Sequence, residues 1–318
     1  MTLFPNKKLV VYELNEVPER ILRHYVTRHP DSNLARVLDG GTYANTVTQD
    51  SGILSPWSTW PTLHRGVTNE KHTIVDFGQA LVDIDEEYPP VWRLLADAGV
   101  STGVFGSLHS YPLPPNAEQY AFYVPDTFAE GPETFPESLE TFQGFNLAMV
   151  DTSNRNVDSG LPVAKAAQFM TRAPWLGLRA GTVFRLARQL LSEQLEPLRR
   201  VRRRTSQTEL AFDFFLKQLK TTRPAFTSFF TNHVASSMHR YWPGTFPNDY
   251  VVKQLPEGWT DKFCSEIDYT MGVADQQVGE LMKFCRQNPA HALVLLSSMG
   301  QAAVDSDEVV LSQLYIQD

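Results

Sequence analysis

Cysteine is scarce in this chain of 318 residues, and Cys264 and Cys285 are its only two. Their spacing fits no metal-binding motif, and a disulfide framework needs more cysteines in a chain of this size. The scarcity therefore argues against a cysteine-bound metal and against a disulfide scaffold. We expect both cysteines to act as small apolar side chains.

Long apolar runs are missing as well. The N-terminal stretch MTLFPNKKLVVYEL reaches Glu13 after a short apolar run, which is too short for a signal peptide or a membrane span. We therefore predict a cytoplasmic protein with no transmembrane segment.

Positive charge is in deficit, with 28 Lys and Arg against 36 Asp and Glu and a net charge of −8. This balance argues against nucleic acid as a partner, because phosphate binding needs a basic surface. The exception is RRVRRR at residues 199–204. That run suits an anionic substrate, an acidic partner, a membrane surface, or simply a solvated helix face.

Apolar segments that resemble buried strands alternate with amphipathic helical segments. Strands are predicted at KLVVYEL, STGVFG, PAFTSFFT and ALVLLSS, with helices between them such as PERILRHYVTRH and DYTMGVADQQVGELMKFCRQ. This alternation predicts an α/β sandwich whose mostly parallel central sheet is covered by helices on both faces. The segment 139–215 interrupts the alternation and is predicted to be an inserted helical cap on a core formed by residues 1–138 and 216–318.

The stretch SGILSPWSTWPTLHRGVTNEKHTIVDFG, residues 51–78, resembles the alkaline phosphatase superfamily, in particular type I phosphodiesterases and nucleotide pyrophosphatases. Glu13 stands at a strand end where that family has an acidic metal ligand, and Ser55 before a proline stands at the nucleophile position. Gly66 and His72 keep the family spacing that follows. One extra residue between Ser55 and Gly66 leaves Ser58 and Thr59 as alternative nucleophiles.

The second half of the chain continues the resemblance but loses metal ligands. FFTNHVASSMHRYW is similar to the family segment in which an Asp and a later His bind metal, and here Ala235 replaces the Asp while His239 is kept. LSSMG has Ser298 and Met299 where the family has Asp and His. A serine hydroxyl and a thioether are poor ligands, so the resemblance implies at most one divalent metal, zinc or manganese, through Glu13 and His239.

Two hypotheses of different classes follow. In the first, the chain is a hydrolase or transferase for small-molecule phosphate or sulfate esters, including glycan or lipid head groups. Its catalytic residues would be Ser55, His239 and His233, and its substrate-binding residues Asn15, Asn232, Thr59 and Ser298. In the second, it is a non-catalytic relative that binds an anionic sugar or lipid head group.

Overall fold

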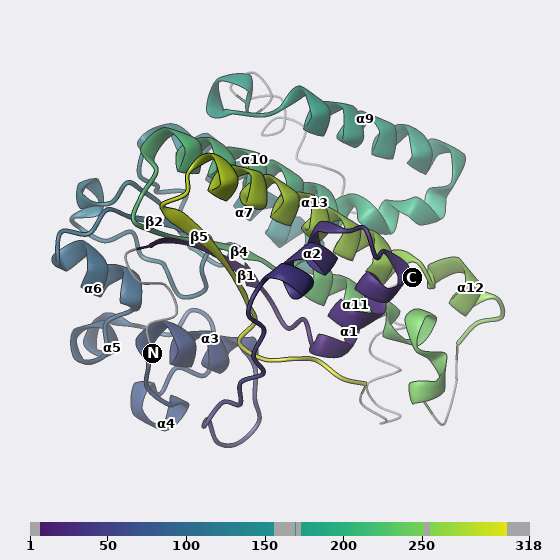
Figure 1. The fold of residues 1–318 in the computed structure, drawn as a ribbon, viewed down its shortest axis with the longest axis horizontal. Coiled ribbons are helices and arrows are strands. Elements are labelled where there is room, and N and C mark those ends of the chain that lie inside the picture. The colour runs from purple at the N-terminus through teal and green to yellow at the C-terminus, as the bar shows by residue number, and fades with distance from the viewer. Residues whose placement is uncertain (1–6, 156–168, 170–172, 251–254, 304–318) are drawn as a thin grey trace.

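The computed structural model describes residues 7–155, 169, 173–250 and 255–303, and its center is a five-stranded sheet (Figure 1). Every strand pair in it is parallel, and the strand order is β3 (Phe122–Val124), β2 (Thr102–Phe105), β4 (Phe226–Thr231), β1 (Lys8–Leu14), β5 (His291–Leu296). The predicted α/β sandwich with a parallel sheet is confirmed.

Helices connect and cover these strands. The α-helices are α1 (Glu19–Arg28), α2 (Asn33–Gly40), α3 (Pro56–Arg65), α4 (Asn69–His72), α5 (Val82–Glu87), α6 (Val91–Asp97), α7 (Glu140–Arg155), α9 (Ala180–Leu195), α10 (Arg203–Thr222), α11 (His233–Thr245), α12 (Trp259–Phe263) and α13 (Glu266–Gln287). Short 3₁₀ turns are η1 (Ala117–Gln119), η2 (Glu137–Leu139), η3 (Pro197–Arg202) and η4 (Pro247–Asp249).

One face of the sheet is covered by α10 and α13 (Figure 1). Tyr12 of β1 and Phe229 of β4 point to this face, where their rings are 5.8 Å apart. Phe215 of α10 packs on Phe229, and the Tyr12 hydroxyl donates to Gln277 of α13 at 2.6 Å. Because alternate strand residues point to opposite faces, this packing turns Glu13 toward the other side of the sheet.

That other face is covered by α3 and α6. Val104 of β2 packs in a smaller apolar cluster with Trp92 of α6, and Phe230 of β4 contacts Trp60 of α3 edge to face. Glu13 therefore lies between the sheet and α3, and its side chain is only 2% exposed.

The predicted cap, residues 139–215, is helical but shares the core of the sheet in the part that the structure describes. Phe142 of α7 and Phe212 of α10 belong to the same hydrophobic cluster as Tyr12 and Phe229. Helix α9 is different, because it lies outside α10 as an additional outer layer (Figure 1).

None of the helices in the described ranges has both the length and the apolar character needed to cross a membrane.

Candidate functional site

Polar side chains from three neighboring strands meet at the carboxyl edge of the sheet. Asn15 follows β1 and donates to Asn232, which follows β4, at 2.7 Å. Ser298, which follows β5, bonds Thr59 of α3 through their hydroxyls at 2.8 Å. Carboxyl ends of parallel strands share one edge, so Asn15, Asn232, Thr59 and Ser298 lie at the same edge of the sheet, in two hydrogen-bonded pairs. Their role in substrate binding stays a prediction.

Ser55 lies immediately before α3, whose first residue is Pro56. Proline suits a first helical position, and Gly66 ends the helix with a φ of 67°, a conformation that glycine adopts without strain. The Ser55 backbone is extended and its side chain makes no capping hydrogen bond. Its hydroxyl is thus at the positive end of the helix without being used to cap it.

The two alternative nucleophiles are inside the first turns of α3. Ser58 and Thr59 are 3% and 2% exposed, and their hydroxyls donate to the Ser55 carbonyl at 3.1 and 3.0 Å. Ser55 is partly exposed by comparison. The structure therefore favors Ser55 as the hydroxyl that a ligand can reach.

The carboxylate of Glu13 is fully engaged on the face covered by α3. His64 Nε2 donates to one oxygen at 2.9 Å, and the Ser107 hydroxyl donates to the other at 2.8 Å. His64 is 4% exposed and stacks on Trp60. Sequence reasoning missed His64, because nothing in the helix sequence around it indicates a partner on β1.

A second network links α3 to His239 on α11. Trp60 Nε1 donates to Asn15 Oδ1 at 2.7 Å, and the Asn15 amide also lies 3.2 Å from Glu16 Oε2. His239 Nε2 donates to the same Glu16 oxygen at 3.1 Å, while Gln301 donates to His239 Nδ1 at 3.1 Å. Glu16 thus orients a half-exposed imidazole, an arrangement typical of a proton-transferring histidine.

Glu16 was also missed from the sequence. Its φ of 55° places it in the left-handed region, which a glutamate rarely adopts and which costs on the order of 1–3 kcal/mol. Such strain concentrates at functional sites, so the conformation adds weight to the pair of Glu16 and His239.

His233 does not join this group. It is buried at the start of α11, with Nδ1 bonded to the Thr231 hydroxyl at 2.6 Å and Nε2 to the Thr270 carbonyl at 3.1 Å. With both ring nitrogens occupied, this side chain joins β4 to α13, and it has no nitrogen left for a substrate.

His233 makes stability depend on pH. Burial lowers its pKa from 6.5 to about 4, so the folded state disfavors the imidazolium that the unfolded chain accepts. The neutral His233 therefore contributes on the order of 3 kcal/mol to the free energy of unfolding. This contribution is complete above about pH 6.5 and is lost as the pH falls toward 4. His109, whose pKa burial also lowers to about 4, adds to this loss. Asp126, whose pKa burial raises to about 6, opposes it.

We therefore expect the free energy of unfolding in urea to fall between pH 6.5 and 4, and His233→Gln to flatten that slope. Ser237→Ala, which removes a buried hydroxyl of the same helix and no titrating group, serves as the control and should leave the slope unchanged. A His233→Gln variant with the slope of the wild-type protein would contradict this account.

The donor groups do not fit a two-metal site. Among the described residues, no three His, Cys, Asp or Glu side chains gather closely enough to hold a metal ion. Glu13 pairs with His64 and His239 pairs with Glu16, so the two predicted metal ligands lie in separate pairs. His64 Nδ1 is buried without a hydrogen-bond partner among the described residues, but one nitrogen and one carboxylate fall short of a zinc ligand set.

His72, which the resemblance places after the Gly66 turn, has a structural role. Its Nδ1 accepts the Ile74 backbone N–H at 3.0 Å and its Nε2 bonds the Thr62 hydroxyl at 2.8 Å. It holds the segment after α4 against α3.

Comparison of the chain with protein-family models, with curated proteins and with solved structures gives no match.

Proposed function

We propose that the chain is a hydrolase or transferase for phosphate or sulfate esters, with Ser55 as the nucleophile. The observation that carries the proposal is a partly exposed serine hydroxyl, free of capping bonds, at the positive end of the ten-residue helix α3. The resemblance to the alkaline phosphatase superfamily supports the same assignment through Ser55 and Pro56.

The N-terminus of α3 would stabilize the negative charge of the substrate. Ser58 and Thr59 direct their backbone N–H groups to the Ser55 carbonyl, while Trp57 N–H has no partner among the contacts of the described residues. An anionic ester oxygen placed there would accept from Trp57 and would be stabilized by the helix dipole. Thr59, Ser298, Asn15 and Asn232 would then position the rest of the substrate along the same edge.

The reaction proceeds in two displacements. The Ser55 oxygen attacks the phosphorus or sulfur, its proton passes to a base, and the ester oxygen leaves with a proton. Water then attacks the phosphoserine or sulfoserine in a hydrolase, or an alcohol does so in a transferase. His239 is the proposed proton carrier through Nδ1 once the Gln301 amide moves aside, and Glu16 holds its Nε2 proton.

The possible metal ligands among the described residues lie only in pairs, Glu13 with His64 and His239 with Glu16, so the proposed steps use side chains alone. A single zinc or manganese ion remains part of the proposal only as an addition to be tested in the assays. The proposed location is the cytoplasm, where the two free cysteines would stay reduced.

The role of His239 is tested with a nitrophenyl phosphate diester, measured with and without added zinc or manganese. We expect His239→Gln to lower kcat on the order of a hundredfold, and Glu16→Gln to lower it less and to shift the pH profile of kcat. His29→Gln is the matched control, because His29, directly after α1, pairs with Asp268 of α13 at 3.0 Å and, among the described residues, makes no contact with those of the site. Equal losses in the His29 and His239 variants would contradict the assignment.

A non-catalytic protein is the second candidate, and the internal pairing of Glu13 with His64 favors it. It would bind an anionic sugar or lipid head group at the end of α3. In that case the wild-type protein turns over no phosphate, sulfate or carboxylate ester, yet inorganic phosphate or sulfate raises its melting temperature.

A further inference from the structure

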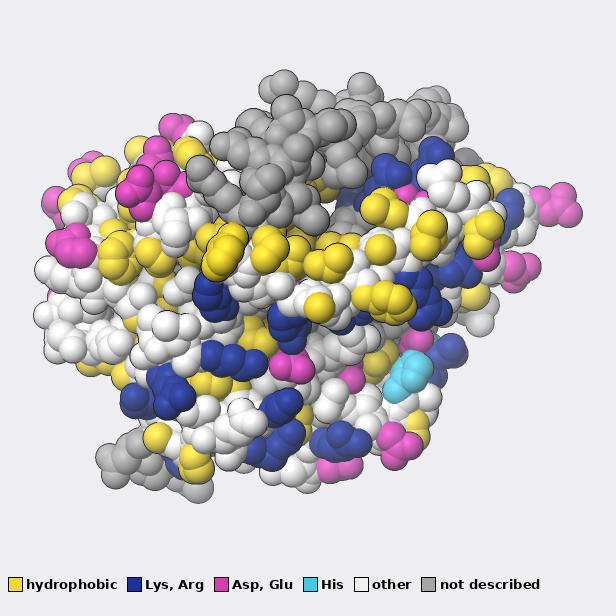
Figure 2. Space-filling view, turned by 90° about the horizontal axis from the view of Figure 1, so that it is seen from above, with side chains coloured by type: hydrophobic (Ala, Val, Ile, Leu, Met, Phe, Trp, Pro, Cys, Tyr) yellow, Lys and Arg dark blue, Asp and Glu magenta, His cyan; other side chains and the backbone are white. Residues whose placement is uncertain are grey.

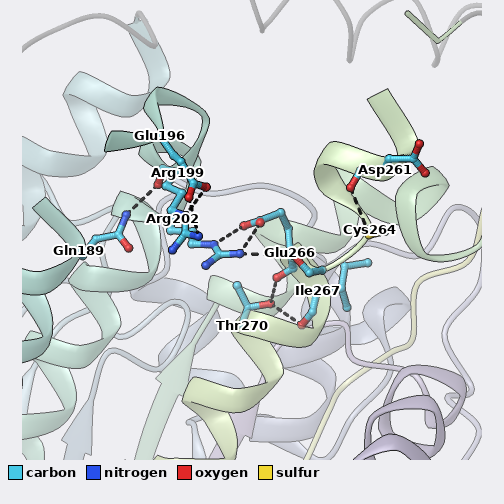
Figure 3. Close-up of polar contacts among 10 residues, drawn as sticks. Gln189, Glu196, Arg199, Arg202, Asp261, Cys264, Glu266, Ile267 and Thr270 are labelled. Carbon is cyan, nitrogen blue, oxygen red and sulfur yellow. Dashed lines mark hydrogen bonds and ion pairs between the residues drawn. The ribbon is translucent and has the colours of Figure 1, made fainter. Parts of the chain in front are cut away.

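Helix α9 turns its polar side toward the protein. Arg185 forms an ion pair with Glu209 of α10, and Glu193, which is 1% exposed, forms one with Arg203. Gln189 donates to the Arg199 carbonyl of η3 (Figure 3). The contacts that hold α9 on the fold are thus mainly polar, the reverse of an ordinary surface helix.

The opposite side of α9 is apolar and exposed. Phe184, Leu191 and Leu195 follow one another at helical spacing and are 69%, 67% and 84% exposed. The apolar stripe is defined here as these three residues with Val183 and Leu190 of the same helix, Trp175 before it and Leu198 of η3 after it. Trp175 is 83% exposed. Figure 2 looks onto this side of the molecule and shows a row of hydrophobic side chains with Lys and Arg beside it.

The charge around the stripe is opposite to that of the whole chain. Residues 179–204 contain eight arginines and two glutamates, a net charge of +6 in a protein of −8. Several of these arginines pair with acids, as Arg202 does with Glu266 and Arg199 with Glu196 (Figure 3). Arg188 and Arg200 are exposed, and neither has an acidic partner among the described residues.

We propose that α9 docks on an anionic membrane surface. The helix would lie in the interface, with the apolar stripe in the boundary between head groups and acyl chains, and with Arg188 and Arg200 on the lipid phosphates. Its 16 residues extend over about 24 Å, so the contact is a single outward ridge along one helix.

The charge decides between a membrane and a second copy of the chain. Two copies meeting through α9 would bring the exposed Arg188 and Arg200 of one copy toward those of the other, whereas an anionic bilayer attracts both arginines. The stripe is also carried by the outermost layer of the fold (Figure 1), where it can reach a flat surface. This proposal does not depend on the chemistry at Ser55.

The first test is co-sedimentation of the full chain with phosphatidylcholine vesicles that contain or lack phosphatidylserine. We expect binding to the anionic vesicles, weakened by salt. Leu191→Gln with Leu195→Gln should weaken it by about tenfold per leucine, since each loses apolar burial. Val82→Gln with Leu94→Gln, at positions 67% and 54% exposed on α5 and α6, is the matched control and should bind normally.

The charge and the contact are tested separately. Arg188→Gln should weaken binding about fivefold, and Lys262→Gln on α12 should have no effect. The emission of Trp175 should shift to the blue on vesicles, and Trp175→Phe should lose that shift. All these side chains are exposed, so melting temperatures should not change.

Vesicle binding that survives the two leucine substitutions would overturn the proposal. Absence of vesicle binding by the wild-type protein would also overturn it. This holds whether the protein is a monomer or a dimer that the two leucine substitutions make monomeric.

Discussion

Ser55→Ala is expected to remove ester turnover, with a loss on the order of ten-thousandfold or more in kcat. The variant would lack the only atom that attacks the ester, while the helix end that binds the anion stays in place. We expect the free energy of unfolding to change by less than about 1 kcal/mol, because the Ser55 side chain makes no capping bond whose loss would weaken α3. Turnover of a nitrophenyl diester and urea denaturation measure the two effects.

Ser58→Ala is the matched control for Ser55→Ala. It removes a hydroxyl three residues away whose only described bond is to the Ser55 carbonyl, so turnover should be kept. If Ser58→Ala or Thr59→Ala abolishes turnover and Ser55→Ala does not, the nucleophile is one of these residues. The alignment of Ser55 with the family nucleophile would then be wrong.

Glu13→Ala should give the largest loss of stability, about 3–5 kcal/mol. Glu13 is buried and accepts hydrogen bonds from His64 and Ser107. Its removal leaves the buried His64 Nε2–H without an acceptor, while Ser107 keeps its bond to the Ser228 hydroxyl at 2.7 Å. The free energy of unfolding in urea measures the loss. Glu196→Ala, at a carboxylate that pairs with Arg199 on the surface, is the control and should have little effect.

Replacing both Glu13 and His64 separates the value of their hydrogen bond from the cost of leaving one partner buried and unpaired. Glu13→Leu with His64→Leu should recover part of the stability that Glu13→Ala loses, since the double variant leaves no unpaired imidazole. If Glu13→Ala unfolds with the free energy of the wild-type protein, the bond to His64 contributes nothing and Glu13 is free for another role.

The edge of the sheet was predictable from the strand ends. Asn15, Asn232 and Ser298 each follow an apolar run, and the parallel arrangement that such runs indicate brings their ends together. These features depend on local sequence, and the structure has them where they were expected.

Hydrogen-bond partners that depend on how helices and strands pack were not predictable from the sequence. His64 meets Glu13 only because α3 lies across β1, and His233 meets the Thr270 carbonyl only because α13 lies beside α11. The left-handed backbone of Glu16 has no signature in a glutamate. These residues determine which groups of the site are available for chemistry, so its hydrogen-bond network could be seen only in the structure.

The direction that α9 faces was hidden for a related reason. Apolar spacing at three and four residues shows that a helix has an apolar side, but it does not show which side meets the protein. The ion pairs of Arg185 with Glu209 and of Glu193 with Arg203, both on the next helix α10, decide that.

Strand β1 pairs with β4 and β5, whose residues come far later in the chain, while β2 and β3 are close in sequence. Contacts between distant segments are slow to form, because a long loop must close before they yield any stabilization. We therefore expect β2 and β3 to associate early in folding and the middle of the sheet to close late. Asn15, Asn232 and Ser298 follow the three strands that close late, so the candidate site would form in one of the last folding steps.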